Sequence, residues 1–236
     1  MRIVLTCIGA MLASVCAQAQ VSVTAGDRDE IQSLAVQYSK ALGSCDAKAF
    51  ADLFESESGF FASGFRGKVE GRERLVALVE SERHCLAPNP DGSRGRPGGA
   101  NVPTVSLDTN SAGFFGVIDL GAAGQYQDEY VRTPAGWRFA SRTVVTPGEK
   151  AAGLDARHMA AIRELSADLP VSDHYEFGEN GSKRFLSSGV VIRVEPGTVG
   201  GRVYLDDGGY YDDVYERTAA GEWRVRSRKL IPAATN

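Results

Sequence analysis

The sequence predicts an α+β fold in two unequal units, each ending in the same antiparallel strand pair. Apolar residues recur at helical spacing between residues 27 and 84. Runs in which β-forming and polar residues alternate follow between residues 102 and 145. The last of these runs, residues 124–142, is repeated as residues 209–228, with Tyr, Asp, Tyr, Arg-Thr, Trp-Arg and Ser-Arg in the same order.

The first unit, residues 27–146, opens with helices. Asp27 and Glu30 have the spacing of a capping box for a helix that ends at Gly43. Asp46 caps a second, shorter helix. Strands and loops dominate the rest of the unit: a strand pair in residues 59–71, a third helix in 72–84, a Pro- and Gly-rich loop in 88–100, strands in 102–107 and 114–120, and the first copy of the repeated pair.

The second unit, residues 154–232, is shorter. A linker is expected at residues 147–153, and Asp155 then caps a helix that runs to about Leu165. Strands follow at residues 187–194 and 201–205, and the second copy of the repeated pair closes the chain. The unit therefore has one helix and about four antiparallel strands, without counterparts of the two leading helices.

Residues 1–19 have the pattern of a signal peptide. Arg2 precedes an apolar core that is too short to span a bilayer, and residues 17–19 form a small-x-small cleavage site. A lipoprotein anchored at Cys16 is the alternative, but Val15 is a poor match to the small residue expected before the cysteine. The mature protein is expected to be periplasmic or secreted, with no membrane association after cleavage.

Cysteines and charge limit the remaining options. Cys45 and Cys85 remain after cleavage, either as a disulfide or as two free thiols, because the sequence does not show how close they lie. The formal net charge is −4 and there is no basic stripe with interleaved aromatic residues, so nucleic acid is not an expected partner. The three histidines lack metal-ligand spacing, and neither a metal nor a cofactor is expected.

The repeated strand pair has a predicted inner and outer face. If Arg217 lies opposite Trp223, unbroken alternation places Glu216 opposite Arg224 and Asp212 opposite Arg228 on a solvated face. In the first copy the same register places Gln127 and Arg142 outside. The predicted inner face of that copy consists of Tyr126, Asp128, Tyr130, Trp137, Phe139 and Ser141.

Asp128 is then a carboxylate among aromatic residues, and two interpretations are open. Burial of a carboxylate is costly unless the group is hydrogen-bonded, or neutral with a raised pKa. Asp128 is either a framework residue bonded to Ser141 or a tyrosine hydroxyl, or a functional acid. Asp213 repeats it in the second unit, which favours the framework interpretation because a catalytic group need not be duplicated.

These residues resemble the nuclear transport factor 2-like superfamily, in particular its SnoaL-like branch. The resemblance covers residues 27–145 and rests on the first two helices, Gly71 before the third helix, and the Tyr-x-Asp-x-Tyr-x-Arg-Thr…Gly-Trp-Arg strand pair. It implies a cone of curved antiparallel sheet wrapped by three helices around an apolar pocket. Members of the family often dimerise through the sheet. The repeat and the missing leading helices suggest that the second unit, a half-repeat of the first, packs its sheet on the first sheet as a pseudo-dimer within a monomer, and a homodimer is the alternative.

Within this superfamily, the resemblance to ketosteroid isomerase implies roles for two residues. Tyr38 and Asp128 stand where that enzyme has the tyrosine and the protonated aspartate of its oxyanion hole. Ala62 or Ser63 stands where it has the general base, and neither residue accepts a proton at neutral pH. Steroid isomerisation is therefore not expected, and Tyr38 is alternatively a packed core residue.

Three functions remain open, and the sequence leaves undecided whether the protein is an enzyme. The preferred one is binding of a small, largely apolar molecule in a cone pocket. The second is a cofactor-independent lyase, isomerase or cyclase with Asp128 as acid/base and Tyr38 as electrophile. The third is a protein-interaction module that uses the sheet face, favoured by a filled cone. The residues predicted to line the pocket beside Tyr38 and Asp128 are Phe50, Phe61, Tyr126, Tyr130 and Trp137.

Overall fold

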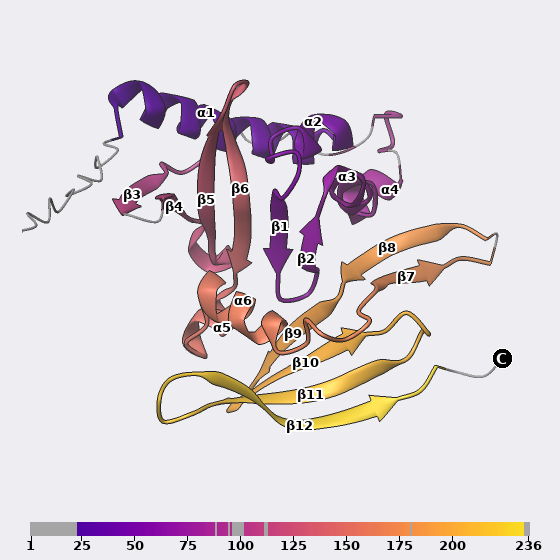
Figure 1. Ribbon diagram of the computed structural model, residues 1–236. Coiled ribbons are helices and arrows are strands. Elements are labelled where there is room, and N and C mark those ends of the chain that lie inside the picture. Colours follow the sequence, from indigo (N-terminus) through magenta and orange to yellow (C-terminus); the bar gives the residue numbers. More distant parts are fainter. Residues whose placement is uncertain are drawn as a thin grey trace, which may run out of the picture.

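The structure is a computed structural model that describes residues 23–87, 89–93, 95, 102–110, 113–179 and 181–233. The predicted signal peptide lies outside these residues. The described strands form an eight-stranded sheet and a four-stranded sheet, with helices on the first sheet and between the two (Figure 1). No helix in the described part of the chain combines the length and apolar character needed to cross a membrane.

The first helix, α1 (Ala25–Gly43), begins one turn earlier than predicted. Its N-cap is Thr24, whose hydroxyl accepts a hydrogen bond from the Asp27 amide while the Asp27 carboxylate accepts one from the Thr24 amide. Asp27 is therefore the far member of the capping box, and Glu30 takes no part in it. The end of α1 at Gly43 and the Asp46 cap of α2 (Ala47–Ala51) are as predicted.

The third predicted helix is interrupted. α3 (Arg72–Glu80) ends at Ser81, and Glu82 adopts an extended conformation before the short helix α4 (Arg83–Leu86). The break places Cys85 beside Cys45, and the two form a disulfide with a Cα–Cα distance of 5.6 Å. The disulfide that the sequence left open thus joins the end of α1 to α4.

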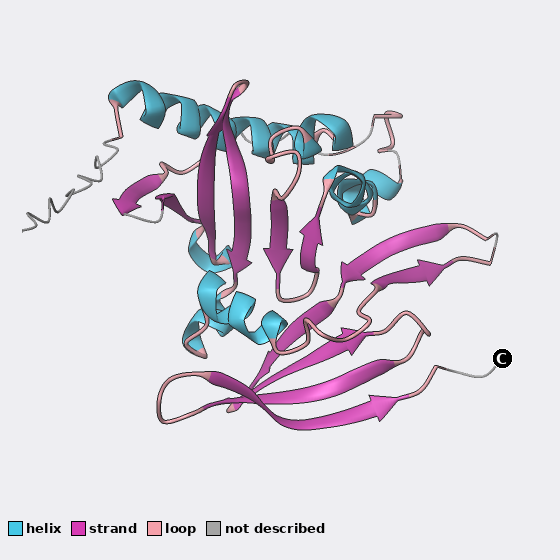
Figure 2. Ribbon diagram, in the orientation of Figure 1, coloured by secondary structure: helices cyan, strands magenta, loops and turns pink. Residues whose placement is uncertain are grey.

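The eight-stranded sheet has the order β3-β4-β5-β6-β1-β2-β8-β7 (Figure 2). Most neighbours are antiparallel, but β1–β6 and β2–β8 are parallel. The strand bounds are β1 (Phe60–Ser63), β2 (Gly67–Glu70), β3 (Ser106–Asn110), β4 (Gly113–Asp119), β5 (Gln125–Thr133), β6 (Gly136–Val145), β7 (Asp173–Phe177) and β8 (Lys183–Ser188). The short 3₁₀ helix η1 (Gly121–Ala123) joins β4 to β5.

β3 starts four residues later than predicted. Pro103 has no amide hydrogen for a sheet ladder. The residues before β3 are instead held by the Gln32 side chain, which accepts a hydrogen bond from the Val105 amide at 2.9 Å and donates to the Pro103 carbonyl at 3.4 Å. The segment is therefore anchored to α1 rather than paired in the sheet.

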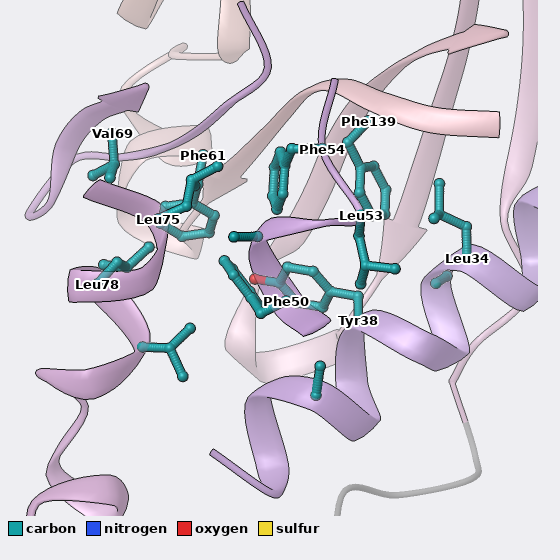
Figure 3. Packing of buried hydrophobic residues seen from close by; sticks show 14 of the residues in the cluster. Leu34, Tyr38, Phe50, Leu53, Phe54, Phe61, Val69, Leu75, Leu78 and Phe139 are labelled. Carbon is teal, nitrogen blue, oxygen red and sulfur yellow. The ribbon is translucent and has the colours of Figure 1, made fainter. Parts of the chain in front are cut away.

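Helices α1, α2 and α3 pack their apolar faces on one face of this sheet. Figure 3 shows Tyr38 of α1 beside Phe50 of α2, and Phe54 contacts both Phe50 and Phe139 of β6. All four side chains are at most 4% exposed. This is the predicted cone, and its interior at this level is occupied by aromatic side chains.

The second unit contains more strands than predicted. The hairpin β7–β8 extends the first sheet at β2, and β9 (Val190–Glu195), β10 (Thr198–Tyr204), β11 (Tyr210–Arg217) and β12 (Trp223–Ile231) form the four-stranded sheet. The single strand predicted at residues 187–194 is two strands, because Gly189 adopts a left-handed conformation with φ of 62°. At this glycine the chain passes from one sheet to the other.

The predicted linker is a short helix, α5 (Pro147–Ala151). It begins with a capping box between Thr146 and Glu149, with proline in the first turn. The next helix, α6 (Ala156–Glu164), is capped by Asp155 as predicted. Thr146-Pro147 with Glu149 is thus a helix-start signal at the boundary between the units.

Helix α6 lies between the two sheets (Figure 1). Its Met159 and Ile162 are fully buried in one cluster with Val145 of β6 on one side and Ile192 of β9, Val199 of β10 and Tyr215 of β11 on the other. On the first unit, the Gln127 side chain accepts a hydrogen bond from the Ala156 amide at 2.8 Å. A helix thus mediates the packing where the sequence predicted direct contact between sheets.

Each copy of the repeated strand pair contains a β-bulge at the same place. In β6 Ala140 is the extra residue, so that Arg142, and not Ser141, lies on the same face as Asp128. In β12 Arg226 is the extra residue, and Arg228 therefore faces Asp213. The prediction that Arg142 points outward and that Asp212 faces Arg228 is wrong, because a bulge reverses the alternation of every later residue in the strand.

A glycine opposite the aspartate is a further part of the repeat. Gly116 pairs with Asp128 and Gly201 with Asp213, and in each copy the ring of the tyrosine two residues after the aspartate lies over the glycine. A Cβ atom on Gly116 would lie 2.7 Å from the Tyr130 ring and 2.8 Å from Val105. Because glycine has no side chain, the tyrosine ring has the space that it needs to reach the aspartate.

Replacing Gly116 with alanine is therefore expected to lower the free energy of unfolding by about 1–3 kcal/mol through overpacking. Urea denaturation followed by circular dichroism measures the change. Gly148→Ala is the control, since a Cβ there has no neighbour within 4 Å and lies in helix α5. A Gly116→Ala protein as stable as this control would show that Tyr130 does not depend on the glycine.

Candidate functional site

Asp128 on β5 is bound on every side. Arg142 on β6 donates two hydrogen bonds to it, from Nε to Oδ1 at 2.8 Å and from Nη2 to Oδ2 at 2.6 Å. The Tyr130 hydroxyl donates a third, to Oδ2 at 2.8 Å. The side chains of Asp128 and Arg142 are 0% and 1% exposed. This is a fully buried, bidentate ion pair.

Aromatic rings surround the Arg142 guanidinium. Its central carbon lies 4.1 Å from the Tyr38 and Phe139 ring centroids and 4.3 Å from that of Tyr126. Burial alone would lower the pKa of Arg142, but the charge and hydrogen bonds of Asp128 raise it above its ordinary value. Three π faces and one carboxylate thus replace the water that the cation loses.

The tyrosines of the cluster are held in the neutral form. Burial, followed by the Tyr126 phenol, raises the pKa of Tyr38 well above its ordinary value. Burial and the Asp128 charge raise the pKa of Tyr130. Tyr38 packs at 5.0 Å from Phe50 and 5.6 Å from Tyr126, between ring centroids. The cluster has no phenolate at neutral pH.

The arrangement limits what Asp128 can do chemically. All three contacts donate to its carboxylate, which is the pattern of an ionised acceptor and leaves no proton to donate to a developing oxyanion. Of the two sequence interpretations, the geometry matches the framework one, with the Tyr130 hydroxyl as the partner and Ser141 on the opposite face. The sequence prediction placed Arg142 on the outer face because it did not include the bulge. Both copies of the repeat contain the bulge, so an alignment of the two copies does not reveal it.

The remaining predicted site residues lie around this cluster or away from it. Phe50 packs against Tyr38, and Phe61 of β1 is the register partner of Arg142. Trp137 lies toward the start of β6, in edge contact with Phe114 at 4.7 Å between ring centroids. Phe50, Phe61 and Trp137 are at most 7% exposed and Tyr126 is partly buried. The structure brings the set together as packed core.

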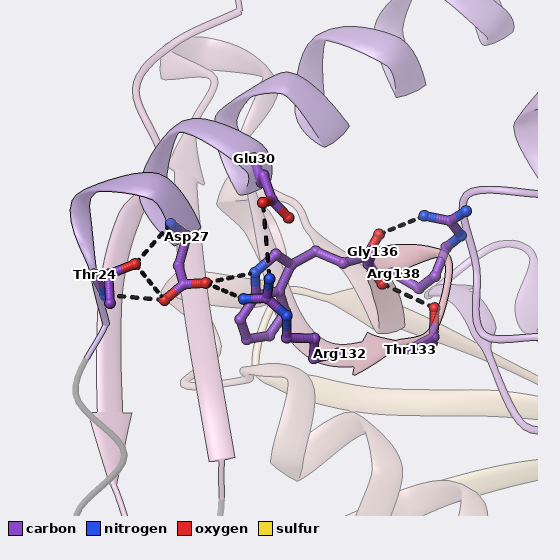
Figure 4. A network of polar contacts seen from close by, with 8 residues as sticks. Thr24, Asp27, Glu30, Arg132, Thr133, Gly136 and Arg138 are labelled. Atoms are coloured by element: carbon purple, nitrogen blue, oxygen red, sulfur yellow. Dashed lines mark hydrogen bonds and ion pairs between the residues drawn. The ribbon is translucent and has the colours of Figure 1, made fainter.

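A second polar network joins α1 to the strand pair through Asp27 and Arg132 (Figure 4), and Trp137 belongs to it. Its indole Nε1 donates to Asp27 Oδ1 at 3.0 Å, and the Arg132 guanidinium bonds to the same oxygen. The other oxygen, Oδ2, accepts from the Thr24 amide and hydroxyl. Asp27 thus caps α1 and fixes the β5–β6 hairpin at once.

This network makes stability depend on pH. Hydrogen bonds from Thr24 and Trp137, and the charge of Arg132, lower the pKa of Asp27 from 3.8 to about 2. Because the folded state has the lower pKa, the stabilisation is fully present above about pH 4 and is lost as the pH falls toward 2. Asp27→Asn is expected to reduce stability at neutral pH and to flatten its decline between these two values.

The measurement is the free energy of unfolding in urea at several pH values. Asp29→Asn, an exposed position in the same turn of α1, is the matched control and should leave the profile unchanged. A profile of the Asp27 variant that runs parallel to that of the wild type would contradict the assignment.

The second copy reproduces the ion pair in a more open setting. Arg228 donates to both oxygens of Asp213, at 2.9 and 2.6 Å, and the Tyr215 hydroxyl donates to the same carboxylate at 3.2 Å. The Arg228 side chain is 25% exposed, and its Nη2 also donates to the Ser166 hydroxyl at 2.9 Å. Each copy of the strand pair thus contains the same structural motif of four residues: glycine, aspartate, tyrosine and arginine.

In the described part of the chain, cavities lie outside these clusters. One, of about 350 Å³, is bounded by α2, the start of α3 and the β5–β6 turn, with Phe54 and Leu75 as its most buried lining residues. The other, of about 500 Å³, lies between the first unit and the half-repeat. Neither is lined by Tyr38 or Asp128.

One group has the composition of a metal site. The ligand atoms of Cys45, His84 and Cys85 lie within 4.8 Å of one another. Both sulfur atoms belong to the disulfide, and the His84 Nε2 atom lies 2.9 Å from the Leu42 carbonyl oxygen. In this oxidised form the group does not offer a set of metal ligands.

Comparison with known proteins assigns the first unit to a family. Residues 23–143 match the profile of the SnoaL-like domain. No curated protein sequence matches the chain.

Among solved structures, the chain is similar to an NTF2-like protein with a cystatin-like fold from Novosphingobium aromaticivorans, at 24% identity over 57% of this chain and 88% of that one, with a TM-score of 0.40. It is also similar to ActVI-ORFA from Streptomyces coelicolor, at 15% identity over 88% of this chain and 97% of that one, with a TM-score of 0.31. The profile match covers more than half of the 236 residues and carries the assignment. The chain belongs to the SnoaL-like family of the nuclear transport factor 2-like superfamily, with a partial repeat at its C-terminal end.

Proposed function

We propose that the protein is an exported, non-catalytic binder of a small, largely apolar molecule. The SnoaL-like fold is of a type that serves ligand binding as well as isomerases and cyclases. The observation that separates these roles is the Asp128–Arg142 pair, in which both charged groups are consumed by each other. A catalytic acid or base must be within reach of a substrate and must exchange its proton.

The binding site that we propose is the cavity of about 350 Å³ at α2, α3 and the β5–β6 turn. Ligand pockets are mostly apolar concave sites of ~300–1,000 Å³ with a few polar groups. Phe54 and Leu75, 3% and 1% exposed, connect the cavity to the aromatic core (Figure 3). The Arg72–Asp52 ion pair, at 2.9 Å, lies at its rim.

Titration with the neutral apolar fluorophore N-phenyl-1-naphthylamine tests this site. Ala135→Trp, at an exposed position of the β5–β6 turn that lines the cavity, is expected to fill it and to weaken binding by about tenfold or more. The matched control is Ala220→Trp in the exposed turn of the second copy, which should bind as the wild type does. Absence of saturable binding, or equal loss in both variants, would refute the proposal.

Export is supported by the disulfide between Cys45 and Cys85, since disulfides persist mainly in oxidising compartments. Expression of the full chain with its own N-terminus, followed by fractionation and mass measurement, tests it. We expect a periplasmic or secreted protein that begins at Gln20. A cytoplasmic protein that retains residues 1–19 would contradict export.

The aromatic side chains that fill the cone favour the alternative of an interaction module, but helix α6 weighs against it and also bears on oligomeric state. It covers the outer face of the first sheet near Thr143 and Val145, which are 3% and 0% exposed. Less of this face is then open to a second protein, which supports a monomer in which the half-repeat takes the place of a partner subunit. Analytical ultracentrifugation distinguishes this from a homodimer.

A further inference from the structure

The larger cavity exists only where the half-repeat meets the first unit. From the first unit it is lined by the β1–β2 turn and the α3–α4 junction, and from the half-repeat by strands β7 to β10. The two units are hydrogen-bonded beside it, from the Ser188 amide to the Arg66 carbonyl at 2.9 Å and from the Ile192 amide to the Gly64 carbonyl at 2.8 Å. A cone domain alone would not form this cavity.

Positive charge gathers in this inter-unit cavity. Arg66, Arg83 and Arg184 line it together with a single carboxylate, Glu82, although the whole chain has a formal net charge of −4. Arg66 donates to Glu82 at 2.8 Å and to the Leu186 carbonyl at 2.9 Å. Arg184 donates to Glu176 on the neighbouring strand at 2.8 Å, whereas Arg83 forms no ion pair with any other residue that the structure describes. A negatively charged ligand is therefore favoured over a neutral or cationic one.

Two buried polar atoms beside the cavity have no partner. The Ser187 side chain is 2% exposed, and its hydroxyl makes no hydrogen bond within the described chain. The Arg66 Nε atom is likewise buried and unpaired. Buried polar groups in native proteins almost always have partners, and an unpaired one is costly. A ligand atom in the cavity would supply the missing partner to Ser187.

Another part of the cavity lining consists of flat aromatic rings. The His174 and Tyr204 rings stack at 4.1 Å between centroids and 6° between planes. Burial, followed by the charge of Arg202, lowers the pKa of His174, so that this ring is neutral at pH 7. Phe65, 60% exposed, also lines the cavity. These rings offer apolar surface to a planar group of the ligand.

We propose that the inter-unit cavity binds a small organic anion with a flat apolar ring, of the chemical class of the aromatic carboxylates. The carboxylate is bound by Arg83 and Arg184 with a hydrogen bond from Ser187, and the ring packs against Tyr204 and His174. Arginine is suited to this role because its planar donors match a carboxylate. This site is separate from the apolar cavity at α2 and α3, and each stands or falls independently.

The mature protein, without residues 1–19, is titrated with benzoate as the probe while its amide chemical shifts are recorded. We expect saturable shifts at Ser187, Arg184 and Tyr204. Benzyl alcohol, which has the ring without the charge, and acetate, which has the charge without the ring, are each expected to bind about tenfold or more weakly.

The variants locate the contacts. Arg83→Gln and Arg184→Gln are each expected to weaken benzoate binding by about tenfold, because a charge-assisted hydrogen bond is lost. Ser187→Ala is expected to weaken it while leaving the melting temperature unchanged or higher, since an unpaired buried hydroxyl is removed. Arg224→Gln is the matched control, because Arg224 forms with Glu216 the same kind of exposed ion pair, at 2.5 Å, that Arg184 forms with Glu176.

Three results would each overturn the proposal: no saturable benzoate shifts at these residues, equal affinity for benzyl alcohol, or equal affinity of the Arg184→Gln and Arg224→Gln proteins. Thermal melts of all variants show whether each is folded. Because N-phenyl-1-naphthylamine is uncharged, its binding and the effect of Ala135→Trp are unaffected by any of these outcomes.

Discussion

Replacing Arg142 with methionine is expected to lower the free energy of unfolding by about 3–5 kcal/mol. The methionine fills much of the space between Tyr38, Tyr126 and Phe139, but it leaves the Asp128 carboxylate buried with only the Tyr130 hydroxyl as a donor. An uncompensated buried charge is the dominant cost. Urea denaturation followed by circular dichroism measures the loss.

The repeat supplies a matched control within the same chain. Arg228→Met breaks the equivalent pair. The Asp213 side chain is 0% exposed, as is that of Asp128, but the Arg228 side chain is 25% exposed against 1% for Arg142, so water can enter from the Arg228 side. A smaller loss of about 1.5–3 kcal/mol is expected, the range for a hydrogen bond to a charged group. Equal losses at the two positions would show that burial does not determine how much the ion pair of this motif contributes to the free energy of unfolding.

A double-mutant cycle separates the charge from the shape. Asp128→Leu combined with Arg142→Met replaces the pair by apolar side chains of similar size, and buried pairs exchanged in this way are often neutral. We expect the double variant to be more stable than Arg142→Met alone. If it is instead as unstable, the pair is needed for the geometry of the bulge rather than for charge compensation.

The bulge explains why the sequence predicted the content of the site better than its geometry. The aromatic residues and Asp128 were placed on the inner face by alternation, and that placement holds up to Phe139 in β6. One extra residue, Ala140, then turns Arg142 inward. Comparing the two copies did not reveal this, because both carry the bulge at the same offset and align without a gap there.

The missed hairpin has a different cause. β7 and β8 contain mostly polar residues. The residues of β7 are partly buried or exposed without alternation, and most of those in β8 alternate only between partly and fully buried. Their place in the sheet comes from pairing with β2 and from Arg66, contacts distant in sequence that no local pattern encodes. The inter-unit cavity depends on this hairpin, so the proposed anion site was beyond sequence reasoning although Ser187 fell within a predicted strand.

The conversion of Cys45 and Cys85 to serine is expected to cost about 4 kcal/mol of stability, because the disulfide closes a loop of 40 residues in the unfolded chain. That loop contains α2, β1, β2 and α3, and thus much of the aromatic core that surrounds Arg142.

The measurement is urea denaturation of the mature wild type and of the double serine variant, each with and without a thiol reductant. Reduction should destabilise the wild type to about the level of the variant and should leave the variant unchanged. A loss below about 1 kcal/mol would mean that the unfolded chain is already compact in this region, so that cross-linking removes little entropy from it.

Removal of the disulfide is also expected to loosen α4, because the Gly95 amide donates a hydrogen bond to the His84 carbonyl beside the disulfide. The first residue of α4, Arg83, lines the inter-unit cavity. The double variant should therefore bind benzoate more weakly than the wild type, whereas Ala220→Trp should not.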